Sequence, residues 1–123
     1  MKRVSGVFVS VVLVTAVLAA VFAAGGAARQ NGSAATARVT VAASEFKFTL
    51  SKRSAPTGTV IFVVTNRGKL THDFKIAGKK TLLIKPGKSA TLRVTLSKGR
   101  YPYVCTVKGH AAAGMKGIFT VTA

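Results

Sequence analysis

The chain has 123 residues, enough for one domain, and its 19 Lys and Arg residues face two acidic ones, Glu45 and Asp73, for a net charge of +17. This excess predicts attraction to an anionic partner, such as an acidic protein or a membrane surface. Because the basic residues are scattered and the aromatic residues follow strand-like spacings, we expect no nucleic acid among the partners.

The N-terminal segment has the pattern of an export signal. Lys2 and Arg3 precede a run without charge from residue 4 to residue 28, which ends in small residues. We expect residues 1–28 to be a signal peptide, cut between residues 24 and 28, or else an uncut membrane anchor, since residues 4–24 could associate with or span a bilayer. The rest is then exported to the periplasm or another extracytoplasmic space.

The remainder of the chain predicts a linker followed by β-structure. Residues 29–37 are small and polar without periodicity, which is typical of a flexible tether. From residue 38 to 123, alternating segments separated by Gly, Pro and Asn predict seven or eight strands in an all-β domain, an antiparallel Greek-key β-sandwich. The apolar run 59–65 predicts a strand covered on both faces. The expected strands are 37–43, 45–50, 59–65, 71–77, 80–87, 89–97, 100–107 and 116–123.

The inner faces of these strands predict one hydrophobic core. The apolar residues at alternating positions are Val39, Val41, Phe46, Phe48, Val60, Phe62, Val64, Phe74, Ile76, Leu92, Val94, Phe119 and Val121. We expect Tyr103 to be a core aromatic residue as well. A β-sandwich by itself implies no function.

Metal-binding residue types gather near the C-terminus. The only cysteine lies there with one of the two histidines and the only methionine besides the initiator, in a Cys-x4-His-x4-Met arrangement. In an exported protein a single cysteine is buried and inert, joined to another chain, or bound to a metal. Two imidazoles, one thiolate and one thioether form the ligand set of a blue-copper electron-transfer site. We therefore predict that His72, Cys105, His110 and Met115 bind one copper ion.

Two segments, "YPYVCTVKGHAAAGM" and "THDFKI", resemble the cupredoxin family, the small type 1 blue copper proteins that include plastocyanins, azurins and rusticyanin. The resemblance extends over residues 38–123 and supports the assignment of His72 as a ligand. It implies a β-sandwich that holds one mononuclear type 1 copper and carries single electrons between redox proteins.

The resemblance also implies a surface for electron transfer beside the loop histidine, made of His110, Ala111, Ala112 and Ala113. Lys108 and Lys116 flank this surface and suit an acidic docking partner. A simpler alternative is a loop that is kept small for packing. We expect the protein to be a monomer.

One position departs from the family pattern, because many cupredoxins have an asparagine where this chain has Asp73. We expect its carboxylate to accept a hydrogen bond from a backbone N–H or from the Thr106 hydroxyl across the ligand loop. A negative charge there would favour Cu(II). The alternative is a solvated aspartate in a turn.

We expect an electron carrier rather than an enzyme, because the sequence shows neither a second copper ligand set nor an open coordination position. Two other functions stay open. The first is a copper-binding or copper-delivery protein of the same fold. The second is a metal-free basic sandwich that binds anionic polymers, in which Cys105 and Met115 would pack as ordinary apolar residues.

Overall fold

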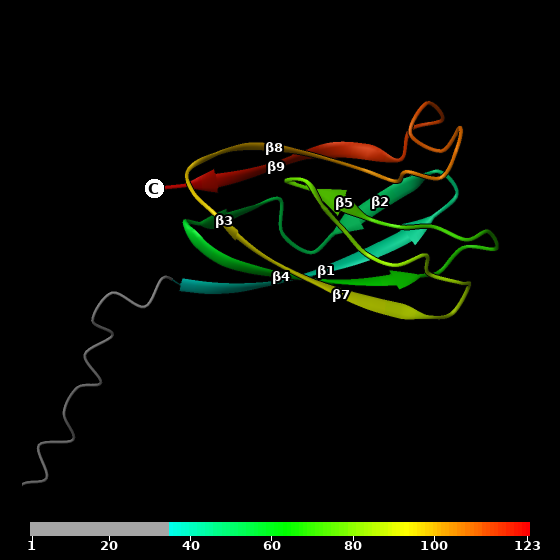
Figure 1. Ribbon diagram of the computed structural model, residues 1–123, viewed down its shortest axis with the longest axis horizontal. Helices are drawn as coiled ribbons and strands as arrows, with labels where there is room; N and C mark the ends of the chain where they lie inside the picture. Colours follow the sequence, from blue (N-terminus) through cyan, green and yellow to red (C-terminus); the bar gives the residue numbers. More distant parts are fainter. Residues whose placement is uncertain (1–34) are drawn as a thin grey trace, which may run out of the picture. The chain divides into compact units, whose positions relative to one another are not determined.

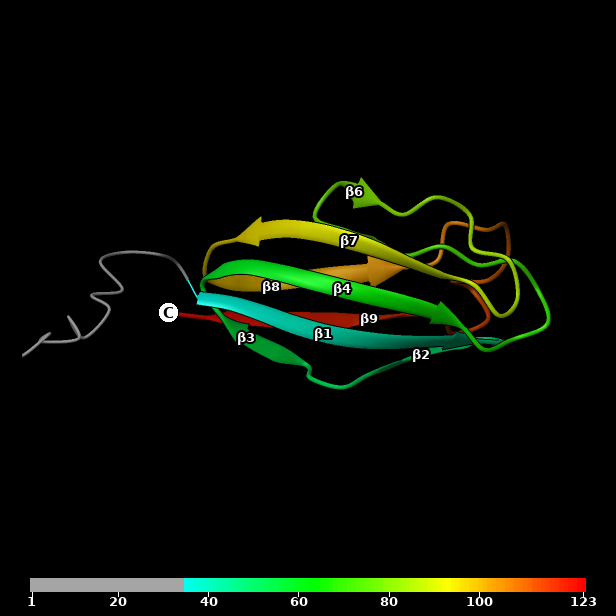
Figure 2. The same cartoon turned by 90° about the horizontal axis from the view of Figure 1, so that it is seen from below.

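The computed structural model describes residues 35–123, which form two β-sheets packed face to face (Figures 1 and 2). This confirms the predicted all-β sandwich. These residues contain no helix, and so none that is long and apolar enough to cross a membrane. The predicted export signal lies outside the described residues, as does most of the predicted linker. The first strand begins at Ala35, so residues 35–37 extend it.

The first sheet has the strand order β2-β1-β4-β7. β1 pairs with β4 in parallel, while β2 and β7 are antiparallel to their neighbours. In β4, buried residues alternate with half-buried ones, so the prediction that this strand is covered on both faces was wrong. A sandwich covers one face of each sheet, and Ile61 and Val63 lie on the other. The strands are β1 (Ala35–Ser44), β2 (Lys47–Leu50), β4 (Gly58–Asn66) and β7 (Ser89–Leu96).

The second sheet has the order β3-β9-β8-β5-β6. β3 is parallel to β9 and the other pairs are antiparallel, so each sheet has one parallel pair instead of the wholly antiparallel pairing that we expected. The nine strands of the described part exceed the predicted seven or eight. Those of this sheet are β3 (Ser54–Pro56), β5 (Lys75–Ile76), β6 (Lys79–Lys80), β8 (Gly99–Val104) and β9 (Lys116–Thr122).

The differences from the predicted strands are concentrated in the second sheet. β3 was missed because it is three residues long and buries only Ala55, which leaves no alternation to detect. The expected strands 71–77 and 80–87 shrink to the short pair β5 and β6 and one isolated bridge between His72 and Ile84. A two-residue turn with positive φ at Ala77 and Gly78 joins β5 to β6.

The core lies between the sheets and is rich in aromatic rings. The Phe62 ring lies 5.1 Å from that of Phe74 and 5.2 Å from that of Phe119, measured between centroids. Tyr103 is buried as expected, and so are the other predicted core residues except two. Phe48 is half-buried. Phe46 is 38% exposed, because it lies in the β1–β2 turn beyond the sheet.

Candidate metal centre

Three connections meet at one end of the sandwich, away from the C-terminus (Figures 1 and 2). They are the β1–β2 turn at residues 45–46, the segment 67–74 after β4, and the loop 105–115 between β8 and β9. The fold thereby brings His72 to Cys105 and His110, although 33 residues separate His72 from the cysteine. All three side chains are buried.

The donor atoms of these three side chains converge on one point. The Nδ1 atoms of His72 and His110 are 3.1 Å apart, and the Cys105 Sγ lies 4.0 Å from the first and 3.6 Å from the second. All three lie within 4.8 Å of one another. Of the described residues, no other group of three or more His, Cys, Asp or Glu side chains is close enough to hold a metal ion.

These separations fit a single metal ion. Imidazole nitrogen and thiolate sulfur bind a divalent ion such as zinc at about 2.0 Å and about 2.3 Å. Each of the three separations is shorter than the sum of the two bond lengths, so one ion could bind all three donor atoms at once. Two imidazoles and one thiolate, with a weak thioether as a further ligand, are the ligand set of a blue-copper site, which His72, Cys105, His110 and Met115 would supply.

His72 is held in place by buried groups. Its backbone N–H donates to the Ile84 carbonyl over 3.1 Å, and its carbonyl accepts from the Ile84 N–H over 2.7 Å. The Asn66 side-chain amide, fully buried, donates to the carbonyls of Leu70 and Ile84 over 2.7 and 2.8 Å. Two residues after His72, the ring of Phe74 is buried in the aromatic core. The segment that carries His72 is therefore fixed from both sides.

Glu45 also contacts His72. Its Oε1 accepts from the backbone N–H groups of Lys69 and Leu70 over 2.8 and 2.7 Å, and lies 3.1 Å from His72 Nε2. Since a carboxylate only accepts, Nε2 carries the proton, which leaves the Nδ1 lone pair of the neutral ring free for a metal. The Leu70 N–H, more than any other contact, lowers the pKa of Glu45 to about 2. Gly68 permits the Glu45 carboxylate to lie this close to the backbone of residues 68–70, because a Cβ on residue 68 would overlap the carboxylate.

The loop that carries the other ligands contains one turn of helical hydrogen bonding. The Ala113 N–H donates to the Gly109 and His110 carbonyls, and Gly114 has a φ of 121°. The Gly114 N–H then donates to the Ala111 carbonyl and the Met115 N–H to the His110 carbonyl, the two bonds of a Schellman ending. This motif places residues five positions apart next to each other, which explains the spacing of His110 and Met115.

Cys105 and Met115 are joined through the backbone, since the Cys105 N–H donates to the Met115 carbonyl over 3.0 Å. Both side chains are buried, Met115 completely. Burial raises the pKa of the Cys105 thiol, and the backbone N–H groups of Asp73 and Val107 oppose this by a smaller amount. A metal that binds this sulfur must therefore displace a proton.

Asp73 lies between the two halves of the site and is buried. Its Oδ1 accepts from the Thr106 backbone N–H over 2.6 Å, and its Oδ2 accepts from the Thr106 hydroxyl. The contact that the sequence predicts is present, and the solvated alternative was wrong. Because Thr106 follows Cys105, this pair of hydrogen bonds ties the histidine segment to the ligand loop. Its effect on copper stays a prediction.

The expected electron-transfer surface is partly exposed. His110 is 8% exposed, Ala111 is half-buried, and Ala112 and Ala113 are exposed. The sequence did not identify Phe46 as part of this surface. Its exposed ring lies edge-on to the His110 ring, with centroids 5.0 Å apart, and adds apolar area beside the alanines.

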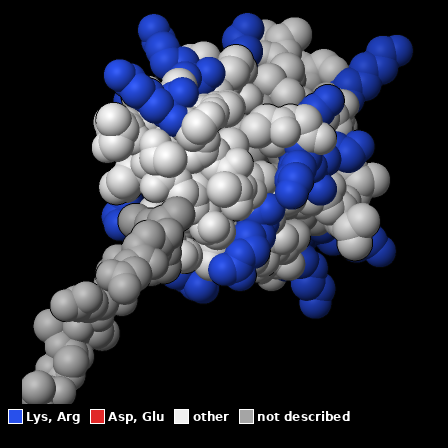
Figure 3. Space-filling view, turned by 60° about the vertical axis from the view of Figure 1, so that its left-hand side comes forward, with Lys and Arg blue, Asp and Glu red and all other residues white. Residues whose placement is uncertain are grey.

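The flanking lysines expected to meet a partner, Lys108 and Lys116, are both exposed. On the face shown in Figure 3, Lys and Arg side chains are widely spread and no acidic side chain is visible. The two acidic residues of the chain instead lie at the candidate metal centre, Glu45 beside His72 and Asp73 beside Thr106. Because acidic residues are so rare in this basic chain, the presence of Glu45 was a signal in the sequence that could have identified it as part of the site.

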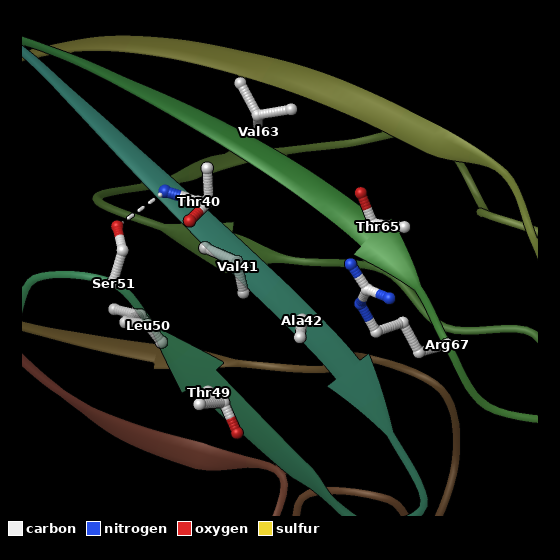
Figure 4. Close-up of a pocket in the computed structure, with 9 residues that line it drawn as sticks. All are labelled: Thr40, Val41, Ala42, Thr49, Leu50, Ser51, Val63, Thr65 and Arg67. Atoms are coloured by element: carbon white, nitrogen blue, oxygen red, sulfur yellow. Dashed lines mark hydrogen bonds between the residues drawn. The ribbon is translucent and has the colours of Figure 1, made fainter.

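A separate hollow of about 360 Å³ lies over β1, β2 and β4 and shares no residue with the metal centre (Figure 4). Its lining includes the hydroxyl groups of Thr40 and Ser51 and one charged side chain, Arg67. The Thr40 N–H donates to the Ser51 hydroxyl over 2.9 Å. None of the lining residues is a histidine, cysteine or methionine, so this hollow offers no soft metal ligand.

Solved structures of similar fold include auracyanin from the photosynthetic bacterium Roseiflexus castenholzii, with 23% identity over 75% of this chain and 100% of that chain and a TM-score of 0.61. Rusticyanin from Thiobacillus ferrooxidans shares 26% identity over 71% of this chain and 77% of its own, with a TM-score of 0.61. A Cu-containing nitrite reductase from Thermus scotoductus matches at 19% identity, over 71% of this chain but 28% of the enzyme, with a TM-score of 0.56.

A sequence search of curated proteins gave no match. The family model of the cupredoxin-like domain matches residues 12–121, which is most of the chain. Together with the two-sheet fold, this match establishes the family that the ligand-loop motif suggested. The chain belongs to the cupredoxin family.

Proposed function

We propose that this protein binds one type 1 copper through His72, Cys105, His110 and Met115 and carries single electrons between redox proteins. The observation that supports this proposal best is the convergence of two imidazole nitrogens and one buried sulfur at separations that fit one ion. Rusticyanin, to which the chain is similar, and an auracyanin described as a "blue" copper protein support the choice of copper.

Copper would supply a change of one electron between Cu(II) and Cu(I). The residues of the chain hold the donor atoms in place through hydrogen bonds. Glu45 and Ile84 hold His72, Asp73 holds the backbone after Cys105, and the Schellman ending holds His110 against Met115. Because these contacts join groups of the protein to one another, they hold the donor atoms in place, and the donor atoms need to move little when the charge on copper changes.

We infer that electrons pass through the surface around His110 and the alanines, and that Lys108 and Lys116 attract an acidic partner there. The basic start and uncharged run of the N-terminal segment support export. We propose a monomeric carrier rather than an enzyme. A site with four protein ligands leaves no obvious position for a substrate. The nitrite reductase match concerns fold alone, over 28% of that enzyme.

Voltammetry of the copper-loaded protein, with copper analysis before and after cycling, tests this proposal. We expect a reversible one-electron wave and full retention of copper. A colourless protein that holds only Cu(I) and releases it to a chelator would instead support a copper-delivery function. A chain that binds no copper and is unchanged by Cys105→Ser would support a metal-free binding sandwich.

A further inference from the structure

Two leucines stand far out of the surface on the connection between β6 and β7, residues 81–88, which we name the leucine loop. Leu82 is 86% exposed and Leu83 is 66% exposed, more than any other large apolar residue that the structure describes. Soluble domains seldom leave two neighbouring large apolar side chains in water without a binding function. Neither residue belongs to the metal centre.

The loop cannot fold these leucines inward, because buried anchors lie on both sides of them. On one side, Thr81 exchanges hydrogen bonds with Phe74: its N–H donates to the Phe74 carbonyl, and its hydroxyl accepts from the Phe74 N–H. On the other side, Ile84 is buried and makes two backbone hydrogen bonds to His72. The fold therefore presents Leu82 and Leu83 outward in a fixed position.

Exposed lysines surround the leucines along the chain. Lys79 and Lys80 precede them, and Lys85 and Lys88 follow them. Lys75 lies directly opposite Lys80 in the β5–β6 pair, an arrangement of like charges that lowers stability. Among the described residues no Lys or Arg forms an ion pair with a carboxylate, so no acid of the domain compensates these lysines.

We propose that the leucine loop docks this protein on a membrane surface that contains anionic lipids. Leu82 and Leu83 would enter the boundary between headgroups and acyl chains, and the surrounding lysines would meet lipid phosphates while their alkyl stems cover apolar surface. A bilayer fits these observations better than a protein partner, because the leucines project instead of lining a groove and because the charged residues of segment 79–88 are all lysines. Ile84, at the end of the exposed pair, is hydrogen-bonded to His72 through the backbone. Docking of the leucine loop would therefore hold the metal centre near the membrane.

The experiment uses the absence of tryptophan from the chain. Leu83→Trp in the full chain introduces one fluorescent reporter at the tip of the loop. Thr49→Trp is the matched control, since Thr49 is also exposed but lies on β2, at the edge of the first sheet away from β7. Any anchoring by the N-terminal segment acts on both variants equally, so a difference between them reports the loop.

With vesicles of phosphatidylglycerol and phosphatidylcholine, we expect a blue shift and quenching by brominated acyl chains for Leu83→Trp and neither for Thr49→Trp. Replacing Lys79, Lys80 and Lys85 by glutamine should weaken this insertion roughly a hundredfold, as three charges near an anionic surface each contribute about a fivefold factor.

Three results would overturn the proposal. The first is an indole at position 83 that stays in water with anionic vesicles. The second is a blue shift with soluble polyglutamate but none with vesicles, which would assign the loop to an acidic protein instead. The third is an equal response with phosphatidylcholine alone, which would remove the role of the lysines.

Discussion

The two halves of the metal centre are built in different ways. The loop 105–115 places Cys105, His110 and Met115 together through hydrogen bonds among near neighbours in the sequence. His72 depends instead on hydrogen bonds to Glu45 and Ile84, which lie outside the loop, and the buried amide of Asn66 in turn binds the Ile84 carbonyl. A ligand set of this kind therefore needs one local motif, which sets spacing, and one tertiary framework, which brings the last ligand to it.

The largest effect is expected from the loop half. Cys105→Ser removes the only thiolate that can bind copper, so the intense visible absorption of the copper-loaded protein should disappear completely. Serine is close to cysteine in size, so the domain should still fold. Absorption spectra after copper addition, with far-UV circular dichroism as the control for folding, check this prediction. Intense visible absorption in the variant would show that the sulfur is not the ligand.

His72→Ala and His110→Ala compare the halves directly in the copper-free protein. His72 is fully buried and bonded to Glu45, so we expect His72→Ala to lower the free energy of unfolding by about 2–4 kcal/mol. His110 lies in a short turn where alanine is favourable, so His110→Ala should cost about 1 kcal/mol. Urea denaturation measures both values. Equal losses would contradict the distinction between framework and loop.

Asp73 joins the two halves, and its substitutions separate charge from hydrogen bonding. Asp73→Asn can keep an acceptor for the Thr106 N–H, so we expect nearly unchanged stability but a higher reduction potential, because a negative charge near copper favours Cu(II). Asp73→Ala should lower the free energy of unfolding by about 1–2 kcal/mol. If Asp73→Asn alters neither the potential nor the copper affinity, Asp73 does not influence the metal.

The smallest effect is expected from Glu45 and depends on pH. Its pKa is lowered from 4.5 to about 2 in the folded protein, so its stabilising contribution is complete above pH 4.5 and is lost as the pH falls through about 2. Glu45→Gln should therefore lower the Tm of the copper-free protein at pH 6 and change it little at pH 2.

Two matched variants control this experiment. Gly68→Ala, which would displace the carboxylate, should reproduce the loss, whereas Lys69→Gln keeps the backbone N–H that binds Glu45 and should not. A difference in Tm that is the same at pH 2 and pH 6 would show that the carboxylate charge is not what stabilises the fold.

The contrast between a local loop and a framework of distant contacts also explains which features could be predicted from the sequence. Alternation of apolar residues identified the sandwich and most of its core, and the Cys-x4-His-x4-Met spacing identified the loop. Phe46 was misplaced because nothing local distinguishes a strand residue from one in the adjoining turn. Glu45 was missed because its partner His72 lies 27 positions away, and Asn66 because its partner Ile84 lies 18 positions away. No spacing in the sequence marks such contacts.

The most direct test of the metal centre is a Cu(II) titration of the purified protein followed by its visible absorption. The four residues from two regions of the chain predict an intense blue absorption that rises linearly and stops at one copper per chain, and that bleaches on addition of one electron equivalent. A weak absorption, or one that saturates at another stoichiometry, would contradict the assignment of His72, Cys105, His110 and Met115 to one type 1 copper.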